Sequence, residues 1–162
     1  MKILVTGFKP YGIRGFIFRK NKSEKVALKL KEKYEFETLI LPVDILCVQK
    51  LVSKIGEYKP DIIICLGQSS NGFRIEEMCY KKTNEKDIIL YSKFAGRIKK
   101  GLKGFVKNDI GDWYCNDIYY EALNRVPKTV FIHLPMFIKF RHVDEIIKFI
   151  LKTESLNISS ST

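Results

Sequence analysis

The sequence predicts an α/β fold whose central strands run parallel. Short apolar runs alternate along the chain with segments whose apolar residues recur at helical spacing. One run, residues 62–66, is apolar at every position, as expected of a strand buried on both faces of a parallel sheet. Strand, helix and strand in succession form βαβ units with right-handed crossovers.

The length of 162 residues suits one domain with a sizeable core. We assign residues 1–152 to that α/β domain and residues 153–162 to a polar C-terminal tail, whose end we expect to fray. The composition, 46% hydrophobic and 29% charged, is ordinary for a soluble protein. No apolar run is long enough to cross a membrane, and the run after Lys2 is too short for a signal peptide.

The N-terminal half contains three predicted strands and two predicted helices. The strands are expected over residues 2–6, 38–43 and 62–66. The helices are expected over residues 23–33 and 44–56. Pro42 should stop the second strand, and Asp44 should cap the second helix. The polar loop 67–72 then follows the third strand, at the edge where open α/β sheets build their sites.

The C-terminal half continues the alternation with shorter elements. Strands are expected over residues 74–80, 105–106 and 129–132. Helices are expected over residues 91–102, 113–124 and 141–152. A polar turn at 83–87 separates the first strand from the first helix, which Gly96 and Gly101 weaken.

A cysteine and a histidine stand where such a fold would build a site. Cys115 lies in the first turn of the helix 113–124, where free N–H groups and the positive end of the helix dipole stabilise a thiolate. His133 follows the strand 129–132 and faces the loops at its carboxyl end. A cysteine beside a histidine is the minimum set for an activated thiol nucleophile. The commoner alternative is that Cys115 is a buried small hydrophobe and His133 a hydrogen-bonded strand residue.

The composition also bears on compartment, cofactors and partners. Four cysteines without a CxxC pair indicate reduced thiols and a cytoplasmic protein, and their spacing does not suit a zinc site. The N-terminal glycines do not match GxGxxG, so we expect no dinucleotide and assign no cofactor. The net charge of +11 suggests affinity for polyanions, but the lysines are scattered and could reflect genome composition. No nucleic-acid-binding motif is present, so nucleic acid is not the partner we expect.

A series of short motifs runs along most of the chain. They are VTGFKPYG at residues 5–12, NKS at 21–23, LPV at 41–43, KPD at 59–61, LGQ at 66–68, IE at 75–76, IGDWYCN at 110–116 and IHLP at 132–135. In sequence order they resemble the TGF-x-PFG, NPS, LPV, KPD, GQ, IER, nucleophile and IHVP segments of the pyroglutamyl peptidase I family of cysteine peptidases, also called pyrrolidone carboxyl peptidases. Each motif is short, but their occurrence in the family's order is specific.

The resemblance implies a three-layer α/β/α sandwich with a mostly parallel sheet and a Cys–His–Glu triad. Cys115 would be the nucleophile, His133 its base and acid, and Glu76 the carboxylate that orients the imidazole. The substrate class would be peptides with an N-terminal pyroglutamyl residue. The alternative for Glu76 is a strand-edge ion pair with Arg74.

The resemblance also implies a pocket for the pyroglutamyl lactam ring. Phe8, Tyr11 and Trp113 match aromatic positions of that pocket, and Gln68 matches a glutamine that could hydrogen-bond the lactam amide. The alternatives are core filling for the aromatic residues and a loop cap for Gln68.

The chain departs from the family between Glu76 and Cys115, where the interval is shorter than in typical members. The missing part corresponds to a loop and hairpin that carry the family's ARIPDN motif and help its subunits assemble. An ungapped count puts Lys86 at the motif's arginine, and the two side chains are not equivalent donors. We therefore do not expect the family's tetramer.

Three functions remain open at this point. The first is a cysteine peptidase that removes N-terminal pyroglutamate, which the retention of all three triad residue types favours. The second is a catalytically impaired homologue that binds a peptide or another partner. The third is a basic α/β domain that binds nucleic acid, which no motif supports.

Overall fold

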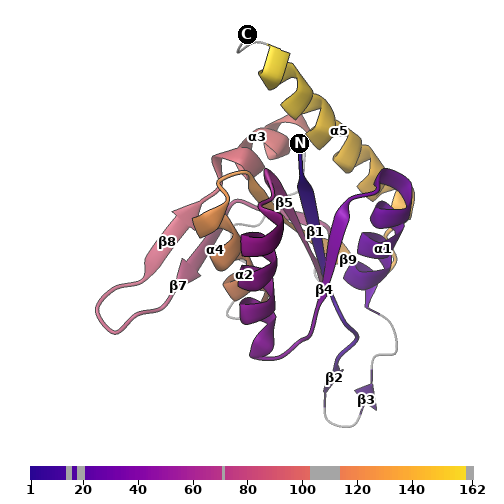
Figure 1. Ribbon diagram of the computed structural model, residues 1–162. Helices are drawn as coiled ribbons and strands as arrows, with labels where there is room; N and C mark the ends of the chain where they lie inside the picture. The colour runs from indigo at the N-terminus through magenta and orange to yellow at the C-terminus, as the bar shows by residue number, and fades with distance from the viewer. Residues whose placement is uncertain (14–15, 18–20, 71, 103–113, 160–162) are drawn as a thin grey trace.

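The structure is a computed structural model, and it describes residues 1–13, 16–17, 21–70, 72–102 and 114–159. Its centre is a five-stranded sheet with the strand order β4-β1-β5-β9-β6 (Figure 1). The strands are β1 (Ile3–Phe8), β4 (Glu37–Leu41), β5 (Ile62–Ser69), β6 (Arg74–Glu76) and β9 (Thr129–Pro135). Four run parallel, and only β6, at one edge, is antiparallel to its neighbour β9. The predicted mostly parallel sheet is thereby confirmed.

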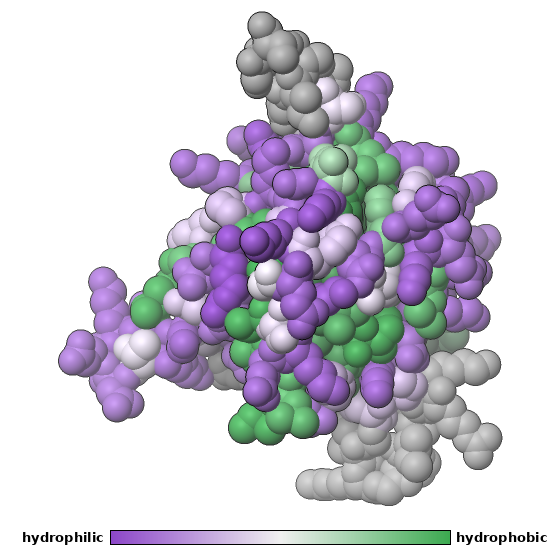
Figure 2. All heavy atoms as spheres, viewed as in Figure 1, coloured by the Kyte–Doolittle hydropathy of each residue, from purple (hydrophilic) through white to green (hydrophobic). Residues whose placement is uncertain are grey.

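Helices cover both faces of this sheet, so the predicted three-layer sandwich is also confirmed. The helices are α1 (Lys22–Tyr34), α2 (Leu46–Tyr58), α3 (Lys93–Gly101), α4 (Tyr114–Arg125) and α5 (Phe140–Ser159). One core cluster joins the sheet to α1, α3 and α5, and a second joins it to α2 and α4. Hydrophilic residues cover most of the outer surface in the view that has α2 in front (Figure 2).

The alternation of side chains along each strand decides which residues face which layer. On β5, Ile62 and Ile64 belong to the α1/α3/α5 cluster, while Ile63 and Cys65 belong to the α2/α4 cluster. Such a strand is apolar at every position because both of its faces are buried. This period of two extends to the ends of the strands, where the candidate site residues lie.

Two small hairpins lie outside the main sheet. Strands β2 (Gly12–Ile13) and β3 (Phe16–Ile17) form one, and β7 (Met78–Lys81) and β8 (Ile88–Tyr91) form the other, which projects beside α4 (Figure 1). The side chain of Asn116 fixes the second hairpin to α4, because it accepts from the Tyr80 N–H at 3.0 Å and donates to the Tyr80 carbonyl at 2.7 Å.

Several expected elements have different bounds. The strand expected over 74–80 is split, because β6 pairs with β9 whereas β7 pairs with β8. Residues 88–91 form a strand, and α3 begins only after Ser92, whose hydroxyl accepts from the Ala95 N–H. Strand β5 continues through Ser69, so the first part of the loop expected over 67–72 is extended. The strand expected at Phe105 and Val106 lies outside the described residues.

The C-terminal helix is longer than expected, because α5 continues past Lys152 to Ser159. Glu154 is fully buried there and is paired with Arg97 and Lys128, which anchors the segment that the sequence indicated as tail. No helix among the described residues is long and apolar enough to cross a membrane.

Candidate active site

His133 and Glu76 meet at the carboxyl end of the sheet. His133 lies near the end of β9 and Glu76 is the last residue of β6, next to β9 in the sheet. Ile132 and Ile75 face the α1/α3/α5 cluster, so by alternation His133 and Glu76 both face the α2/α4 layer. Nδ1 of His133 lies 2.8 Å from Oε1 of Glu76, and both side chains are buried. The sequence-predicted pair is therefore in hydrogen-bond contact.

Arg74 belongs to the same group, although the sequence suggested it only as an ion-pair partner of Glu76. Its side chain lies on the same face of β6 as Glu76, two residues along the strand. Nε donates to Oε1 of Glu76 at 3.0 Å, and Nη2 lies 3.3 Å from Nδ1 of His133. One carboxylate oxygen of Glu76 thus makes both the contact with His133 and the ion pair with Arg74.

Gly67 makes room for the histidine ring. It pairs with His133 across β5 and β9 and lies on the same face of the sheet. A Cβ at this position would lie 2.9 Å from two ring atoms of Phe131 and 3.0 Å from Cδ2 of His133. The Phe131 and His133 rings pack together at 4.8 Å between centroids. The absence of a side chain at Gly67 lets both rings lie against the strand.

Helix α4 carries Cys115 and is fastened to the same strands. The buried Tyr119 donates its hydroxyl to the Glu76 carbonyl at 2.8 Å, so α4 is tied to the backbone of β6. Cys115 is the second residue of α4, half-buried, and packs against the α2/α4 cluster, which contains Phe131. No hydrogen bond joins its thiol to His133 among the described residues.

The electrostatics of Cys115 differ from the expectation of a stabilised thiolate. Burial raises the pKa of its thiol to about 12, with a further rise from the Glu76 carboxylate and an opposing effect from Arg74. Burial is the largest cause of this rise, because the thiol packs against an apolar core. Burial likewise raises the pKa of Cys47 to about 11 and those of Cys65 and Cys79 to about 12. Among the four thiols, Cys115 stands out by its exposure, since the other three are fully buried.

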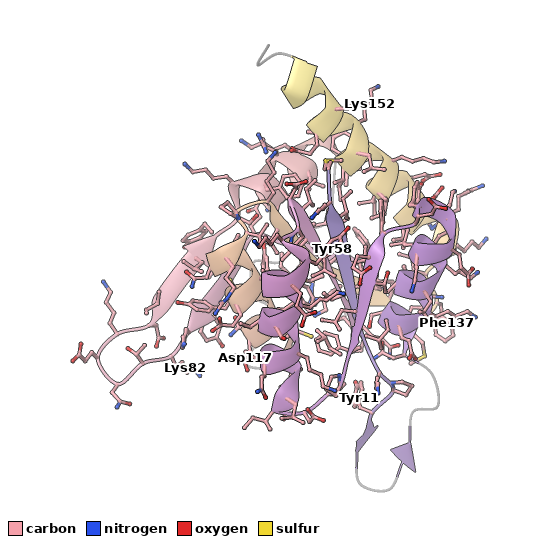
Figure 3. The ribbon with its side chains drawn as sticks, in the orientation of Figure 1. Tyr11, Tyr58, Lys82, Asp117, Phe137 and Lys152 are labelled. Carbon is pink, nitrogen blue, oxygen red and sulfur yellow. The ribbon has the colours of Figure 1, made fainter. Side chains whose placement is uncertain are left out.

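The four predicted substrate-binding residues are found in different settings. Phe8 is 4% exposed in the α2/α4 core cluster. Gln68 accepts from the Lys22 N–H at 2.6 Å and so caps the start of α1. Tyr11 is half-buried just beyond β1, at the carboxyl end of the sheet (Figure 3). Trp113 lies outside the described residues.

Two surface hollows on the described residues are lined by neither His133 nor Glu76. One, of about 130 Å³, is lined by Val48, Tyr80, Lys81, Asp117, Tyr120 and Glu121. The other, of about 280 Å³, is lined by Leu90, Tyr91, Lys93, Leu123, Asn124 and Pro127. No cluster of ligands that could hold a metal ion occurs within the described part of the chain.

Comparison with known proteins gives the same family that the motifs resemble. Residues 1–79 match the family model described as pyroglutamyl peptidase. A pyrrolidone-carboxylate peptidase of Thermoanaerobacter sp. (strain X514) is 29% identical over 171 residues, covering 83% of this chain and 82% of the relative. The pyrrolidone-carboxylate peptidase of Streptococcus pneumoniae (strain 70585) is 25% identical over 177 residues, covering 83% of this chain and 78% of the relative.

The fold is shared with solved structures. The pyrrolidone carboxyl peptidase from Thermococcus litoralis superimposes with a TM-score of 0.77 at 19% identity, covering 99% of this chain and 96% of that one. The Thermoanaerobacter match extends over 171 residues while including 83% of a 162-residue chain, so that relative has internal residues without a counterpart here. The family model matches the N-terminal part of the chain, and the curated relatives and the shared fold agree with it, so the chain is similar to the pyroglutamyl peptidase family.

Proposed function

We propose that this protein is a cysteine peptidase that removes an N-terminal pyroglutamyl residue from peptides. The observation that carries the proposal is the 2.8 Å contact between His133 and Glu76, on the sheet face that α4 covers with Cys115. The similarity of the chain to the pyroglutamyl peptidase family, with relatives named pyrrolidone-carboxylate peptidases, suggests the substrate class.

The proposed reaction has two acyl-transfer steps. Sγ of Cys115 attacks the carbonyl carbon that joins the pyroglutamyl residue to the next residue, and its proton passes to Nε2 of His133. The imidazolium returns this proton to the leaving amine as the C–N bond breaks, which leaves a thioester on Cys115. Water, deprotonated by His133, then hydrolyses the thioester and releases pyroglutamate. Glu76 holds the proton on Nδ1 and stabilises the imidazolium.

The proposal requires Cys115 and His133 to approach each other when substrate binds. Catalytic hydrogen bonds are often long in free enzymes and tighten in the substrate complex. Substrate would also exclude water from the thiol and bring a carbonyl carbon to the sulfur, so that proton transfer and attack are coupled. A free thiol with a raised pKa is compatible with this mechanism provided that His133 accepts its proton during attack.

Four residues are proposed to bind the pyroglutamyl ring. Tyr11 and Trp113 would supply its apolar walls, and the buried Phe8 would support the floor beneath Cys115, because both pack in the α2/α4 cluster. The oxygen of Gln68 is engaged with Lys22, which leaves its amide N–H groups to donate to the lactam carbonyl.

The test is turnover of a fluorogenic pyroglutamyl amide by the purified protein, with the corresponding prolyl amide as the control substrate. Prolyl amide has the same ring size but lacks the lactam carbonyl, so it should not be cleaved. Cys115→Ser and His133→Ala should each abolish turnover, whereas Cys47→Ala, which removes a buried thiol from α2, should retain it. Absence of turnover by the wild-type protein would refute the proposal.

A partner-binding homologue without activity is the second candidate. It is favoured by one observation on the half-buried Cys115: the pKa of its thiol is raised to about 12, and the thiol has no hydrogen bond to His133 among the described residues. This candidate predicts that pyroglutamyl peptides bind in titration calorimetry without being cleaved. Cleavage at a rate that depends on Cys115 would exclude it.

A further inference from the structure

The Arg74–Glu76–His133 group contains a permanent cation that the triad chemistry does not require. We propose that Arg74 is a positioning residue, which keeps Glu76 ionised and so fixes the neutral imidazole of His133 in the tautomer that carries its proton on Nδ1. The three side chains are buried on one face of the sheet, at 9%, 0% and 4% exposure respectively. The inference concerns the tautomer of His133, and only its kinetic consequence rests on the proposed function.

The donors and acceptors of this group permit two arrangements. In the first, Glu76 is a carboxylate, which only accepts, so Nδ1 of His133 must donate across the 2.8 Å contact and Nε2 is a free acceptor. In the second, Glu76 is protonated and donates to Nδ1, which places the ring proton on Nε2. Only the first arrangement leaves Nε2 able to accept a proton from a thiol.

Burial alone favours the second arrangement. Glu76 is fully buried, and its Oε2 atom has no hydrogen-bond partner within the described part of the chain. Removing a carboxylate from water disfavours its charged form. The hydroxyl of Tyr119 does not stabilise the charged carboxylate by a hydrogen bond, because it donates to the backbone carbonyl of Glu76.

Arg74 reverses this preference. Its Nε donates to Oε1 of Glu76 at 3.0 Å, and it is the only Lys or Arg side chain paired with this carboxylate among the described residues. A guanidinium remains charged throughout the working range of a protein. The contact of 3.3 Å between Nη2 and Nδ1 is then an approach of two donors and not a hydrogen bond, since Nδ1 already carries the proton directed at Glu76.

The chain offers a direct test, because it contains only two histidines. Histidine-selective ¹⁵N labelling gives two imidazoles, and the exposed His142 serves as the internal control. Long-range proton–nitrogen spectra in alkaline buffer distinguish a protonated from an unprotonated ring nitrogen. We expect wild-type His133 to be protonated on Nδ1. A wild-type His133 protonated on Nε2 would overturn the proposal.

Two variants separate the charge of Arg74 from its volume. Arg74→Gln keeps a donor but removes the charge, and it should move the proton of His133 to Nε2. Arg74→Lys keeps the charge and should retain the Nδ1 proton. Arg97→Met is the matched control, because Arg97 also pairs with a buried glutamate, Glu154, and should leave His133 unchanged. An Nδ1 proton retained in folded Arg74→Gln would overturn the proposal.

Kinetics give the second readout. Arg74→Gln should lower kcat by about 10²–10⁴-fold with KM little changed, as for loss of the correct tautomer in other triads. Arg74→Lys should stay within about tenfold of wild type. If Arg74→Gln does not fold, Arg74→Lys decides: a folded Lys variant with its proton on Nε2 contradicts the role of charge. If the tautomers behave as expected but pyroglutamyl amides are not cleaved, the proposed function fails and this inference stands.

Discussion

Gly67→Ala is the substitution that most directly perturbs the geometry of the candidate site without altering any of its polar groups. The added methyl would lie 2.9 Å from Cε1 and Cζ of Phe131 and 3.0 Å from Cδ2 of His133. Both neighbours are buried on a central strand, so neither can turn into solvent. To reach ordinary carbon–carbon contact of about 3.5–4.0 Å, one of the rings must move by about 0.5–1 Å.

The size of the effect follows from this displacement. Overpacking of a close-packed core costs about 1–3 kcal/mol, which should appear as a lower free energy of unfolding. A shift of His133 of this size would lengthen its 2.8 Å contact with Glu76 and move Nε2 away from its path to Cys115. Misplacement by about 1 Å costs about 10²-fold in rate, so kcat/KM should fall by about that factor.

Urea unfolding and turnover of a pyroglutamyl amide measure the two effects. Gly56→Ala is the matched control, because nothing lies within 4 Å of the added Cβ at that position in α2. This control should leave turnover unchanged and stabilise the protein by about 0.5–1 kcal/mol, the cost of a glycine in a helix. If Gly67→Ala unfolds and turns over like the wild type, His133 does not lie against Gly67 and the described site geometry is wrong.

The remaining predictions concern the Cys115 thiol, the Asp144 carboxylate and the oligomeric state. Iodoacetamide should modify Cys115 before the three fully buried cysteines, and the rate should keep rising from neutral pH toward about 12, since burial raises the pKa of this thiol; a plateau near neutral pH would show a pre-formed thiolate. Hydrogen bonds from Lys33 and Tyr34 hold the pKa of Asp144 below its usual value. The ionised carboxylate therefore stabilises the fold at pH values above the usual pKa of an aspartate, and this contribution is lost as the pH falls through the lowered pKa. Asp144→Asn should therefore cost about 1 kcal/mol in urea unfolding at neutral pH and nothing in strong acid, and an equal cost at both would count against the pairing. If the chain lacks the segment that joins subunits, as the motif resemblance implies, light scattering should give a monomer or an oligomer other than a tetramer, and a tetramer would contradict this.

The layers of the fold could be predicted because hydrophobic periodicity reports them directly. The apolar run within β5 and the amphipathic pattern of α2 each indicate the type of element and its buried face from the residues of that segment alone. The division at Glu77 could not be predicted, because β6 and β7 are separated by their pairing partners, β9 and β8, and pairing is not visible in a single short run. The length of α5 was missed for a similar reason, since Glu154 is held by residues from other elements.

Part of the candidate site could likewise be predicted from the sequence, and part of it could not. The motifs indicated Glu76 and His133, and strand alternation explains why both face α4. The environment of Cys115 could not be inferred from its place in a first helical turn, because the core against which it packs is built from other elements. Arg74 belongs to none of the recognised sequence motifs, and its proposed role depends on the antiparallel register that pairs it with His133. Gln68 matches a motif, but its oxygen caps α1.

In the proposed mechanism, the pyroglutamyl group acylates Cys115. Covalent trapping with a pyroglutamyl chloromethyl ketone, followed by intact-mass analysis and peptide mapping, tests this step directly. We predict one adduct per chain, located on Cys115, with loss of turnover in proportion to labelling and protection by a pyroglutamyl amide. Labelling of a different residue, or turnover that persists after Cys115 is fully modified, would contradict it.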